Sequence, residues 1–364
     1  MTIKEITSFL ESLAPLSSQE SYDNSGLIVG NQNGELTKAL ICLDSTEAVV
    51  DEAIENGCNL IIAHHPIVFK GLKKLTGKNY VERVVLKCIK NDIALYAIHT
   101  NLDNYRFGVN HEIGSRLGLE NLRVLAPKQG NLNKIAVYVP RPQVNELASA
   151  MYAAGAGSIG DYKDCSFQTE GKGTFTPIQN ANPVIGELNV AEEVAETKLE
   201  VLVDDHRLYG VIAAMKNAHP YEEVAYDIVG LKNENQFEGA GMVGELKQSL
   251  STKDFLKLVK ETFNCGIIRH TAIVKDEVKR IAFCGGSGSF LLSDAIRYNA
   301  DVYITGDFKY HEFFDAEDKL VIADIGHFES EQFTINLLSA ILTKKFPNFA
   351  HCLTTINTNP INYL

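Results

Sequence analysis

In the first third of the chain, short continuous apolar runs alternate with segments whose apolar residues recur every three or four positions. The continuous runs lie at 38–44, 59–63 and 93–100, and the segments at 46–57 and 79–91 have helical spacing. Buried strands that alternate with amphipathic helices are typical of an α/β fold with a largely parallel sheet. We therefore predict such a fold for this part of the chain.

The same alternation resumes after residue 251. The pattern predicts helices at 252–263 and 327–346 and strands at 270–274, 301–307 and 319–326. We expect one α/β domain built from two separate parts of the sequence, residues 1–127 and 238–364.

The segment 131–232 has a different pattern. Its apolar runs predict the order strand, helix, strand, strand, helix, strand, which is that of a ferredoxin-like α+β unit. We predict that this segment is a domain inserted into a discontinuous α/β domain. The glycine-rich stretch 233–246, "NENQFEGAGMVGEL", is expected to be a connection that returns the chain to the first domain.

Composition and charge narrow the classes of partner. The formal net charge is −12, which argues against nucleic acid as the main partner, because phosphate binding needs clustered Lys and Arg. We expect no membrane span, since no run of about 20 apolar residues occurs. The 7 cysteines include no CxxC pair, and the N-terminal residues predict an amphipathic helix and not a signal peptide. These features favour a cytoplasmic protein with reduced thiols.

Side chains that could carry chemistry follow the predicted strands. Functional groups in open α/β sheets collect beyond the carboxyl ends of strands, so we expect these side chains at one edge of the sheet. The residues in question are His64, His65, His99, Thr100, Asn101, Asp103, Thr305, Asp307, Tyr310, His311, His327, Glu329 and Glu331.

Imidazoles and carboxylates without a thiolate suit Zn, Fe(II), Mn or Co better than Ca. His327 and Glu331 are four residues apart and would share one face of a helix. An isolated pair of this kind is usually a surface contact, and an isolated His–His doublet is usually incidental. The residue types alone therefore leave a metal site and an incidental arrangement both open.

The stretch "CGGSGS" at 284–289 has two interpretations. A glycine-rich turn between a strand and a helix can bind an anion through its backbone N–H groups. It can equally serve close packing of the strand against the helix.

Several motifs resemble those of one family in the same order. They are "SYDNSGLIVG" (21–30), "IIAHHPIVF" (61–69), "HTNLD" (99–103), "CGGSG" (284–288), "YITGD" (303–307) and "IGHFESE" (325–331). Together they resemble the GTP cyclohydrolase I type 2 homologues, also called the Nif-three-like or YbgI-like family. The stretch "AHPYEEVAYDIV" (218–229) resembles the PII/CutA-like domain inserted in the longer members of that family.

The resemblance implies a dinuclear divalent-metal centre within a toroidal homohexamer. Carried over to this sequence, it implies that His64 and Asp103 bind one ion, that His65 and His327 bind the other, and that Glu331 bridges the two. Successive side chains on a strand point to opposite faces, so the His64–His65 doublet fits two ions better than one. The metals implied are Zn, Fe, Mn or Co.

Two functions remain open. The first is a metal-dependent hydrolase that acts on a nucleotide or phosphoester through a metal-activated water, with His99 as the candidate acid or base; His99 could equally be a structural histidine. The alternative is a non-enzymatic metal-handling or small-molecule-sensing protein. The stretch "HPYEE", with His219, Glu222 and Glu223, could serve such sensing or could simply form a turn with a solvated acidic edge.

Overall fold

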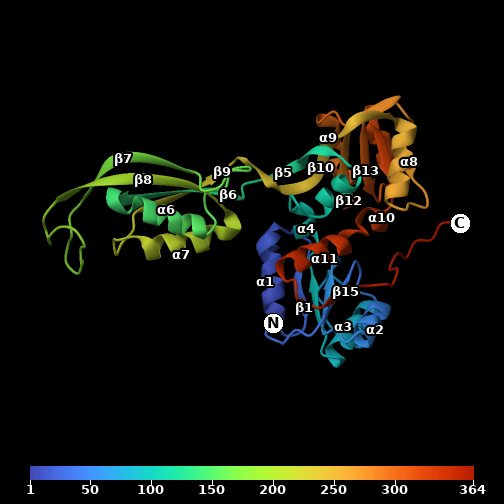
Figure 1. The fold of residues 1–364 in the computed structure, drawn as a ribbon, viewed down its shortest axis with the longest axis horizontal. Coiled ribbons are helices and arrows are strands. Elements are labelled where there is room, and N and C mark those ends of the chain that lie inside the picture. The colour runs from blue at the N-terminus through green and yellow to red at the C-terminus, as the bar shows by residue number, and fades with distance from the viewer. The chain divides into compact units, whose positions relative to one another are not determined.

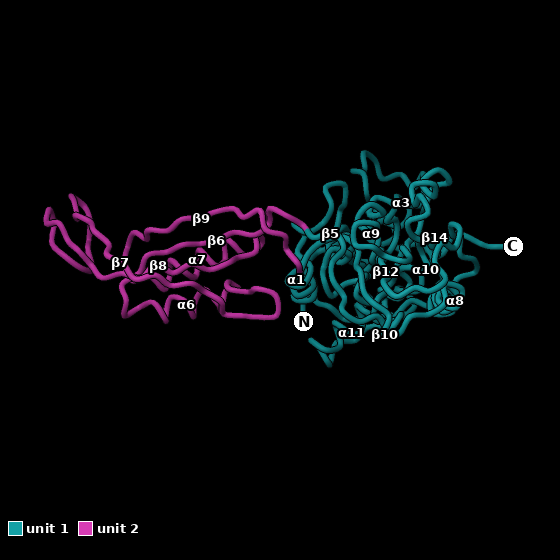
Figure 2. The backbone as a smooth tube through the Cα atoms, turned by 90° about the horizontal axis from the view of Figure 1, so that it is seen from above, with its two compact units in different colours: residues 1–127, 237–364 teal, residues 128–236 magenta.

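The computed structural model describes all residues from Met1 to Leu364. They form two compact units, which Figure 2 shows in different colours. Unit 1 contains Met1–Pro127 and Phe237–Leu364, and unit 2 contains Lys128–Gln236. None of the helices combines the length and the hydrophobicity that a transmembrane span requires.

The first sheet of unit 1 has five strands in the order β1-β4-β3-β2-β15 (Figure 1). Strands β15, β2, β3 and β4 run parallel, and β1 is antiparallel to β4. Helices α2 and α3 pack on one face, whereas α1 and α11 pack on the other. The bounds are α1 (Ile3–Leu13), β1 (Gly26–Val29), β2 (Ala39–Cys42), α2 (Glu47–Glu55), β3 (Leu60–Ala63), α3 (Tyr80–Lys90), β4 (Ala94–Ala97), α11 (Thr334–Lys345) and β15 (His351–Leu353).

The second sheet of unit 1 has six strands in the order β11-β14-β13-β12-β10-β5. Strands β12, β13 and β14 are parallel, β10 is antiparallel to β12, and β11 is antiparallel to β14. The bounds are α5 (Val109–Arg116), β5 (Glu120–Gln129), β10 (Glu234–Ser251), α8 (Thr252–Thr262), β11 (Arg269–His270), β12 (Glu277–Ser287), α9 (Leu292–Arg297), β13 (Val302–Gly306), η5 (Tyr310–Ala316) and β14 (Val321–Asp324). One hydrophobic core joins α5 and α8 to both sheets.

The division into two sheets differs from the single sheet that the sequence predicts. Each part of the chain also lends a strand to the other sheet: β5 joins the second sheet, and β15 joins the first. Such exchanges depend on contacts between distant segments, which local periodicity does not encode.

Three local predictions are wrong. The stretch 233–246 is not a connection but most of β10, because its backbone pairs with β12 from Met242 onward and buries Met242 and Val243. Pairing with a neighbouring strand thus outweighs the low strand propensity of glycine. The helix expected at 327–346 is divided into α10 (His327–Glu331) and α11. The strand expected at 270–274 is shortened to β11.

Unit 2 contains one four-stranded antiparallel sheet in the order β7-β8-β6-β9. Both of its helices pack on the same face and enclose a single core (Figure 1). The elements follow one another as β6 (Leu132–Pro140), α6 (Val144–Ala153), β7 (Ser166–Phe175), β8 (Glu192–Asp204), α7 (Leu208–Ala218) and β9 (Tyr226–Leu231).

Candidate metal centre

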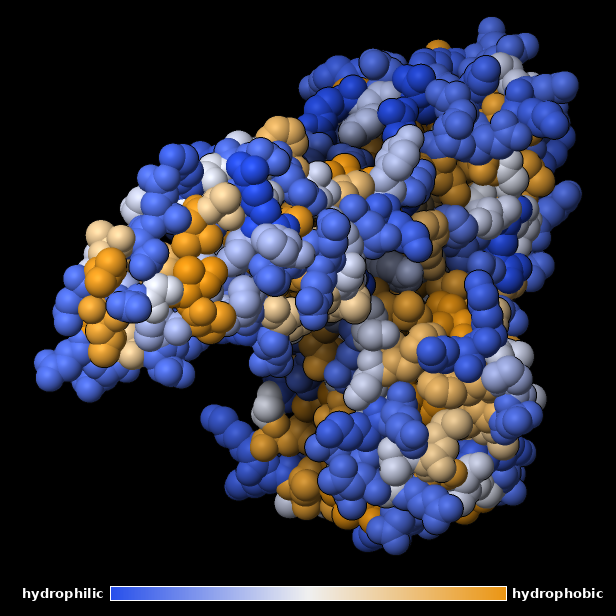
Figure 3. All heavy atoms as spheres, turned by 60° about the vertical axis from the view of Figure 1, so that its left-hand side comes forward, coloured by the Kyte–Doolittle hydropathy of each residue, from blue (hydrophilic) through white to orange (hydrophobic).

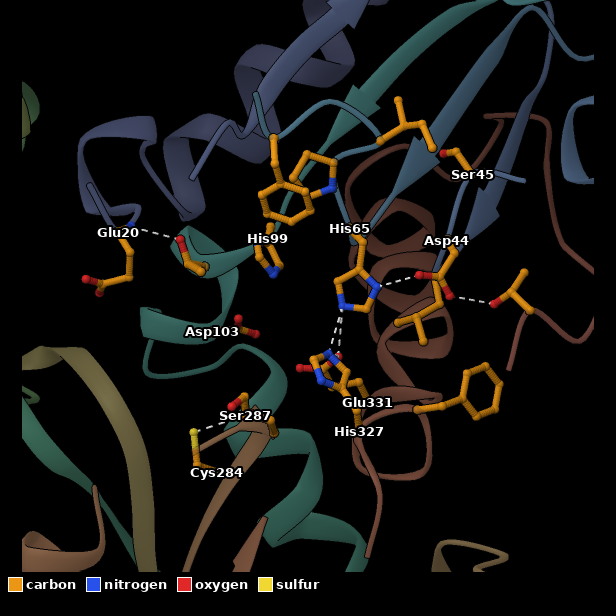
Figure 4. A pocket seen from close by; sticks show the side chains of 18 of the residues that line it. Glu20, Asp44, Ser45, His65, His99, Asp103, Cys284, Ser287, His327 and Glu331 are labelled. Atoms are coloured by element: carbon orange, nitrogen blue, oxygen red, sulfur yellow. Dashed lines mark hydrogen bonds and ion pairs between the residues drawn. The ribbon is translucent and has the colours of Figure 1, made fainter. Parts of the chain in front are cut away.

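A cavity of about 690 Å³ lies in unit 1, beyond the carboxyl ends of the strands of both sheets. His64 and His65 directly follow β3, and His99 follows β4. His327 and Glu331 lie on α10, which begins soon after β14. The sequence predicted that the polar residues lie at one edge of a single sheet. They come instead from the edges of two sheets. The two edges converge at the cavity, and Figure 4 shows His65, His99, Asp103, His327 and Glu331 around it.

Six side chains singled out from the sequence meet at this place. The ligand atoms of His64, Asp103 and Glu331 lie within 4.8 Å of one another, and so do those of His65, His327 and Glu331. His99 forms a third group of this kind with His64 and His65. Asp103 reaches the site from α4 (Thr100–Asn104), a short helix that directly follows His99.

Glu331 lies between the two main groups, and its side chain is only 2% exposed. Its Oε2 lies 3.0 Å from His65 Nε2 and 3.1 Å from His327 Nε2. Its Oε1 lies 3.9 Å from His64 Nε2. His64 Nε2 is in turn 3.6 Å from Asp103 Oδ1. Each carboxylate oxygen of Glu331 thus faces a different set of ligand atoms.

Two of these atoms form no hydrogen bond. His64 Nε2 and Asp103 Oδ1 are both buried, and neither forms a hydrogen bond. Buried polar atoms of this kind are rare, because leaving them unsatisfied costs about 1–3 kcal/mol each. A cation placed between them would satisfy both, so the donor set fits a metal ion.

The Nδ1 atom of each candidate histidine ligand is already used, which leaves Nε2 to face the cluster. The Nδ1–H of His64 donates to Ile98 O (2.8 Å), and that of His65 donates to Asp44 Oδ1 (2.7 Å). The Nδ1–H of His327 donates to Asp307 Oδ2 (2.8 Å). Metal-ligating histidines usually have this arrangement, because the second hydrogen bond fixes both the ring orientation and the tautomer.

Without an ion, the charges at the site are balanced by protons. Burial lowers the pKa of His64 to about 4, so His64 is neutral near pH 7. Burial also disfavours the charged form of His65 and His327, but the carboxylates of Asp44, Asp307 and Glu331 outweigh it. They raise the pKa of His65 to about 10 and that of His327 to about 11.

The two carboxyl groups at the centre respond in opposite directions. Burial and the negative charge of Glu331 raise the pKa of Asp103 well above its usual value. Burial would also raise the pKa of Glu331, but the neighbouring imidazoles, His327 foremost, hold it well below its usual value. A site with this much buried acid and imidazole has the electrostatics expected of a functional centre.

The glycine-rich turn 284–289 packs against Glu331. Gly286 has a φ of +63°, and a Cβ at this position would collide with Glu331 Oε1. The Gly286 N–H donates to Ser330 Oγ (2.9 Å), and the Gly285 N–H donates to Asn110 Oδ1 (3.0 Å). Because these N–H groups already have partners, the contacts support close packing and not anion binding.

Sequence reasoning missed two residues that hold the site. Asp44 accepts from His65, and Asp23 accepts from the Nδ1–H of His99 at 2.8 Å. Asp44 ends the apolar run 38–44, so the rule applied to the other strand ends could have found it. Asp23 lies in a loop without periodicity and carries no such signal. Thr305 was singled out from the sequence because it follows a predicted strand. It is buried, and its hydroxyl donates to the carbonyl oxygen of Gly286 in the glycine-rich turn.

His311, another residue singled out from its place after a strand, lies on η5 and does not line the cavity.

Comparison with known proteins identifies the family. The family model of Duf34/NIF3 (NGG1p interacting factor 3) matches residues 1–360. The chain belongs to the Duf34/NIF3 family. It is 40% identical over 324 residues to the GTP cyclohydrolase 1 type 2 homolog of Halalkalibacterium halodurans. These residues make up 88% of this chain and 87% of that protein. The homolog of the same name from Staphylococcus epidermidis is 35% identical over 371 residues, with 100% of both chains covered.

Solved structures of family members have the same fold. The Bacillus cereus protein related to NIF3 superposes with a TM-score of 0.87 at 37% identity and covers 100% of this chain and 99% of its own. The Staphylococcus aureus protein SA1388 gives a TM-score of 0.78 at 31% identity with the same coverage. The family resemblance of the motifs is thus confirmed, as is a mixed α/β fold.

Proposed function

We propose that this Duf34/NIF3 family member is a metal-dependent hydrolase with a dinuclear divalent-metal centre. The observation that carries the proposal is the pair of ligand groups that share Glu331, together with the unpartnered atoms His64 Nε2 and Asp103 Oδ1. In this proposal His64 and Asp103 hold one ion, His65 and His327 hold the other, and Glu331 contacts both. A set of imidazoles and carboxylates suits Zn, Fe(II), Mn or Co.

Two divalent ions at such a centre would supply a nucleophilic water and stabilise the attacking and leaving oxygens of a hydrolytic reaction. His99 lies beside the centre, and Asp23 fixes its ring through Nδ1. In this proposal His99 accepts or donates a proton through its other nitrogen. The cavity volume of about 690 Å³ is sufficient for a nucleotide-sized molecule. The names of the curated relatives support a nucleotide as the substrate class.

A metal-handling role is the second candidate, and the uneven exposure of the centre favours it. The side chain of His64 is 0% exposed, whereas those of His327 and Asp307 are 35% and 49% exposed. An ion held by His65 and His327 would therefore be open to exchange with a donor or acceptor of metal.

The remaining proposals concern the surroundings of the site. We propose that unit 2 is a ferredoxin-like domain of the PII/CutA-like kind, which its element order and strand order support. We also propose a toroidal homohexamer in the cytoplasm. Family membership supports this assembly, and light scattering that gives a stable monomer would contradict it.

One comparison tests the enzymatic proposal. The protein is purified without chelator, its metal content is counted by elemental analysis, and hydrolysis of GTP and simple phosphoesters is measured for the wild type and Asp103→Ala. We expect about two ions per chain and a turnover that Asp103→Ala abolishes. Asp51→Ala is the control, since Asp51 lies on α2 outside the cavity and its side chain is 54% exposed.

The possible results separate the two candidates. Turnover that survives in Asp103→Ala after the ions are lost would refute the hydrolase. Full metal occupancy without turnover across the substrate panel would support metal handling instead. An ion content of one or none per chain would contradict the dinuclear centre.

A further inference from the structure

A second cavity lies entirely within unit 2. Its volume is about 350 Å³, and it is enclosed by the end of β7, the segment 176–185 that follows β7, and the turn between α7 and β9. This volume is within the range of small-molecule sites in proteins. None of the residues that line it belongs to the candidate metal centre.

The walls of this cavity are largely apolar. They include the side chains of Phe175, Pro177, Ile178, Val184 and Ile185. Exposed hydrophobic residues also gather on unit 2 in Figure 3, where this unit comes forward at the left. The segment that carries most of the wall is tied down, because the Asn182 N–H donates to Glu222 Oε1 at 2.8 Å. This bond links the apolar wall to the turn between α7 and β9.

A buried carboxylate also lines the cavity. Glu196 is only 8% exposed and lies on β8 opposite Gly171 of β7. A Cβ at Gly173, two residues further along β7, would collide with the carboxylate of Glu196. Glycine at position 173 thus makes the space that the carboxylate fills, and glycine in a strand often marks such a close approach. No Lys, Arg or His lines the cavity, so the carboxylate faces it without a positive partner.

The "HPYEE" stretch adds a hydroxyl group to the same cavity. The buried Tyr221 hydroxyl lies beside Glu196, and burial together with the Glu196 carboxylate raises the pKa of this hydroxyl to about 12. The Tyr221 ring packs edge-on against Phe175 at 6.0 Å between centroids. His219 positions this turn: its Nε2–H donates to Tyr138 O (2.9 Å), and its Nδ1 accepts from the Tyr221 N–H (3.1 Å). His219 is therefore structural, whereas Tyr221 contributes to the cavity.

We propose that the cavity of unit 2 binds a small organic cation, with its positive head on the Glu196 carboxylate and its apolar body against Phe175 and Ile178. The Tyr221 hydroxyl is a neutral neighbour of this carboxylate, and no positive side chain lines the cavity. A buried carboxylate without a cationic partner is costly, and a cation would compensate it. The Tyr221 hydroxyl can hydrogen-bond to a polar atom of the same head group. This site is separate from the proposed hydrolase centre, and neither proposal depends on the other.

The test uses three probes of nearly equal shape and different charge, namely benzamidine, benzamide and benzoate. Each is titrated by calorimetry into the full-length wild-type protein, Glu196→Gln and Glu193→Gln. Glu196→Gln keeps the side-chain shape and removes the charge. Glu193→Gln is the matched control, because Glu193 lies on the same strand but is exposed and does not line the cavity.

We expect benzamidine to bind the wild type at least about tenfold more tightly than benzamide, and benzoate not to bind, because only the cation compensates Glu196. Glu196→Gln should lower the benzamidine affinity by about tenfold or more, and Glu193→Gln should leave it unchanged. Circular dichroism melting curves check that both variants fold. The proposal is overturned if benzamidine does not bind, if benzamide binds equally well, or if Glu196→Gln binds benzamidine like the wild type.

Discussion

Metal loading of the proposed centre should release protons. Near pH 7.5 the ion-free protein carries a proton on His65, whose pKa is raised to about 10, and on His327, whose pKa is raised to about 11. Metal ligation needs the deprotonated nitrogen, so the ions must displace both protons. His64, with a pKa lowered to about 4, has none to lose at this pH. Asp103, with its raised pKa, adds a further proton at any pH at which it is protonated.

The sign and size of the pH dependence follow from this count. A ligand that holds a proton in the ion-free state weakens metal binding tenfold for each unit by which the pH falls below its pKa. Two such ligands together weaken metal binding about a hundredfold per pH unit. The combined binding free energy of the two ions should therefore become less favourable by about 2.7 kcal/mol per pH unit as the pH falls from about 9 to about 7. This slope depends on both pKa values lying above the range and not on their separate magnitudes.

Calorimetry measures the proton count directly. Zn²⁺ is titrated into metal-free protein near pH 7.5 in buffers of different ionisation enthalpy, and the dependence of the heat on the buffer gives the number of protons released. We expect about two to three protons per chain for the pair of ions. A release of less than about one proton would refute the reasoning, because His65 and His327 could not then both be protonated ligands.

Three further predictions concern the groups around the centre. Asp44→Asn should reduce the number of protons released on Zn²⁺ loading near pH 7.5, because loss of the Asp44 charge lowers the pKa of His65, whereas Asp23→Asn, which acts on His99, should leave that number unchanged; the same calorimetry measures both. Gly286→Ala should lower the metal content of a protein that still folds, because its Cβ displaces Glu331, and elemental analysis with circular dichroism checks this. Removal of the metals with a chelator should lower the melting temperature. If the free metal concentration had been about 1,000 times Kd, the free energy of unfolding should fall by about 4 kcal/mol. An unchanged melting temperature would argue against a bound ion.

The local pattern of apolar residues was sufficient to predict most helices and strands. It was insufficient to predict how the strands assemble into sheets. The buried strands β2, β3 and β4 are continuous apolar runs, and the helices between them have a clear apolar stripe, so both could be recognised from the sequence. The exchange of β5 and β15 between two sheets is decided by pairing across distances of more than a hundred residues, as between β15 and β2. No local pattern distinguishes such pairing from pairing within one half of the chain.

The candidate site was more predictable than the fold around it. Its histidines and carboxylates follow strands, and the rule that functional groups collect at carboxyl ends holds for each sheet separately. Asp44 was missed although it obeys that rule, because it was counted as the last residue of a strand. Asp23 could be found only from the structure, since its hydrogen bond to His99 spans 76 residues.

The histidine doublet that follows β3 shows how strand geometry produces an asymmetric centre. The two rings lie 4.9 Å apart between centroids, and both face Glu331. His64 is fully buried and faces Asp103 and Glu331 Oε1, whereas His65 faces Glu331 Oε2 and His327. His64 belongs to the group with Asp103 and Glu331, and His65 belongs to the group with His327 and Glu331. Two ions held in this way would have different surroundings, one enclosed by protein and one next to the exposed His327. The enclosed ion would then serve mainly to hold Glu331 in place, and the more exposed ion would be the one that a substrate or an exchanging partner meets first.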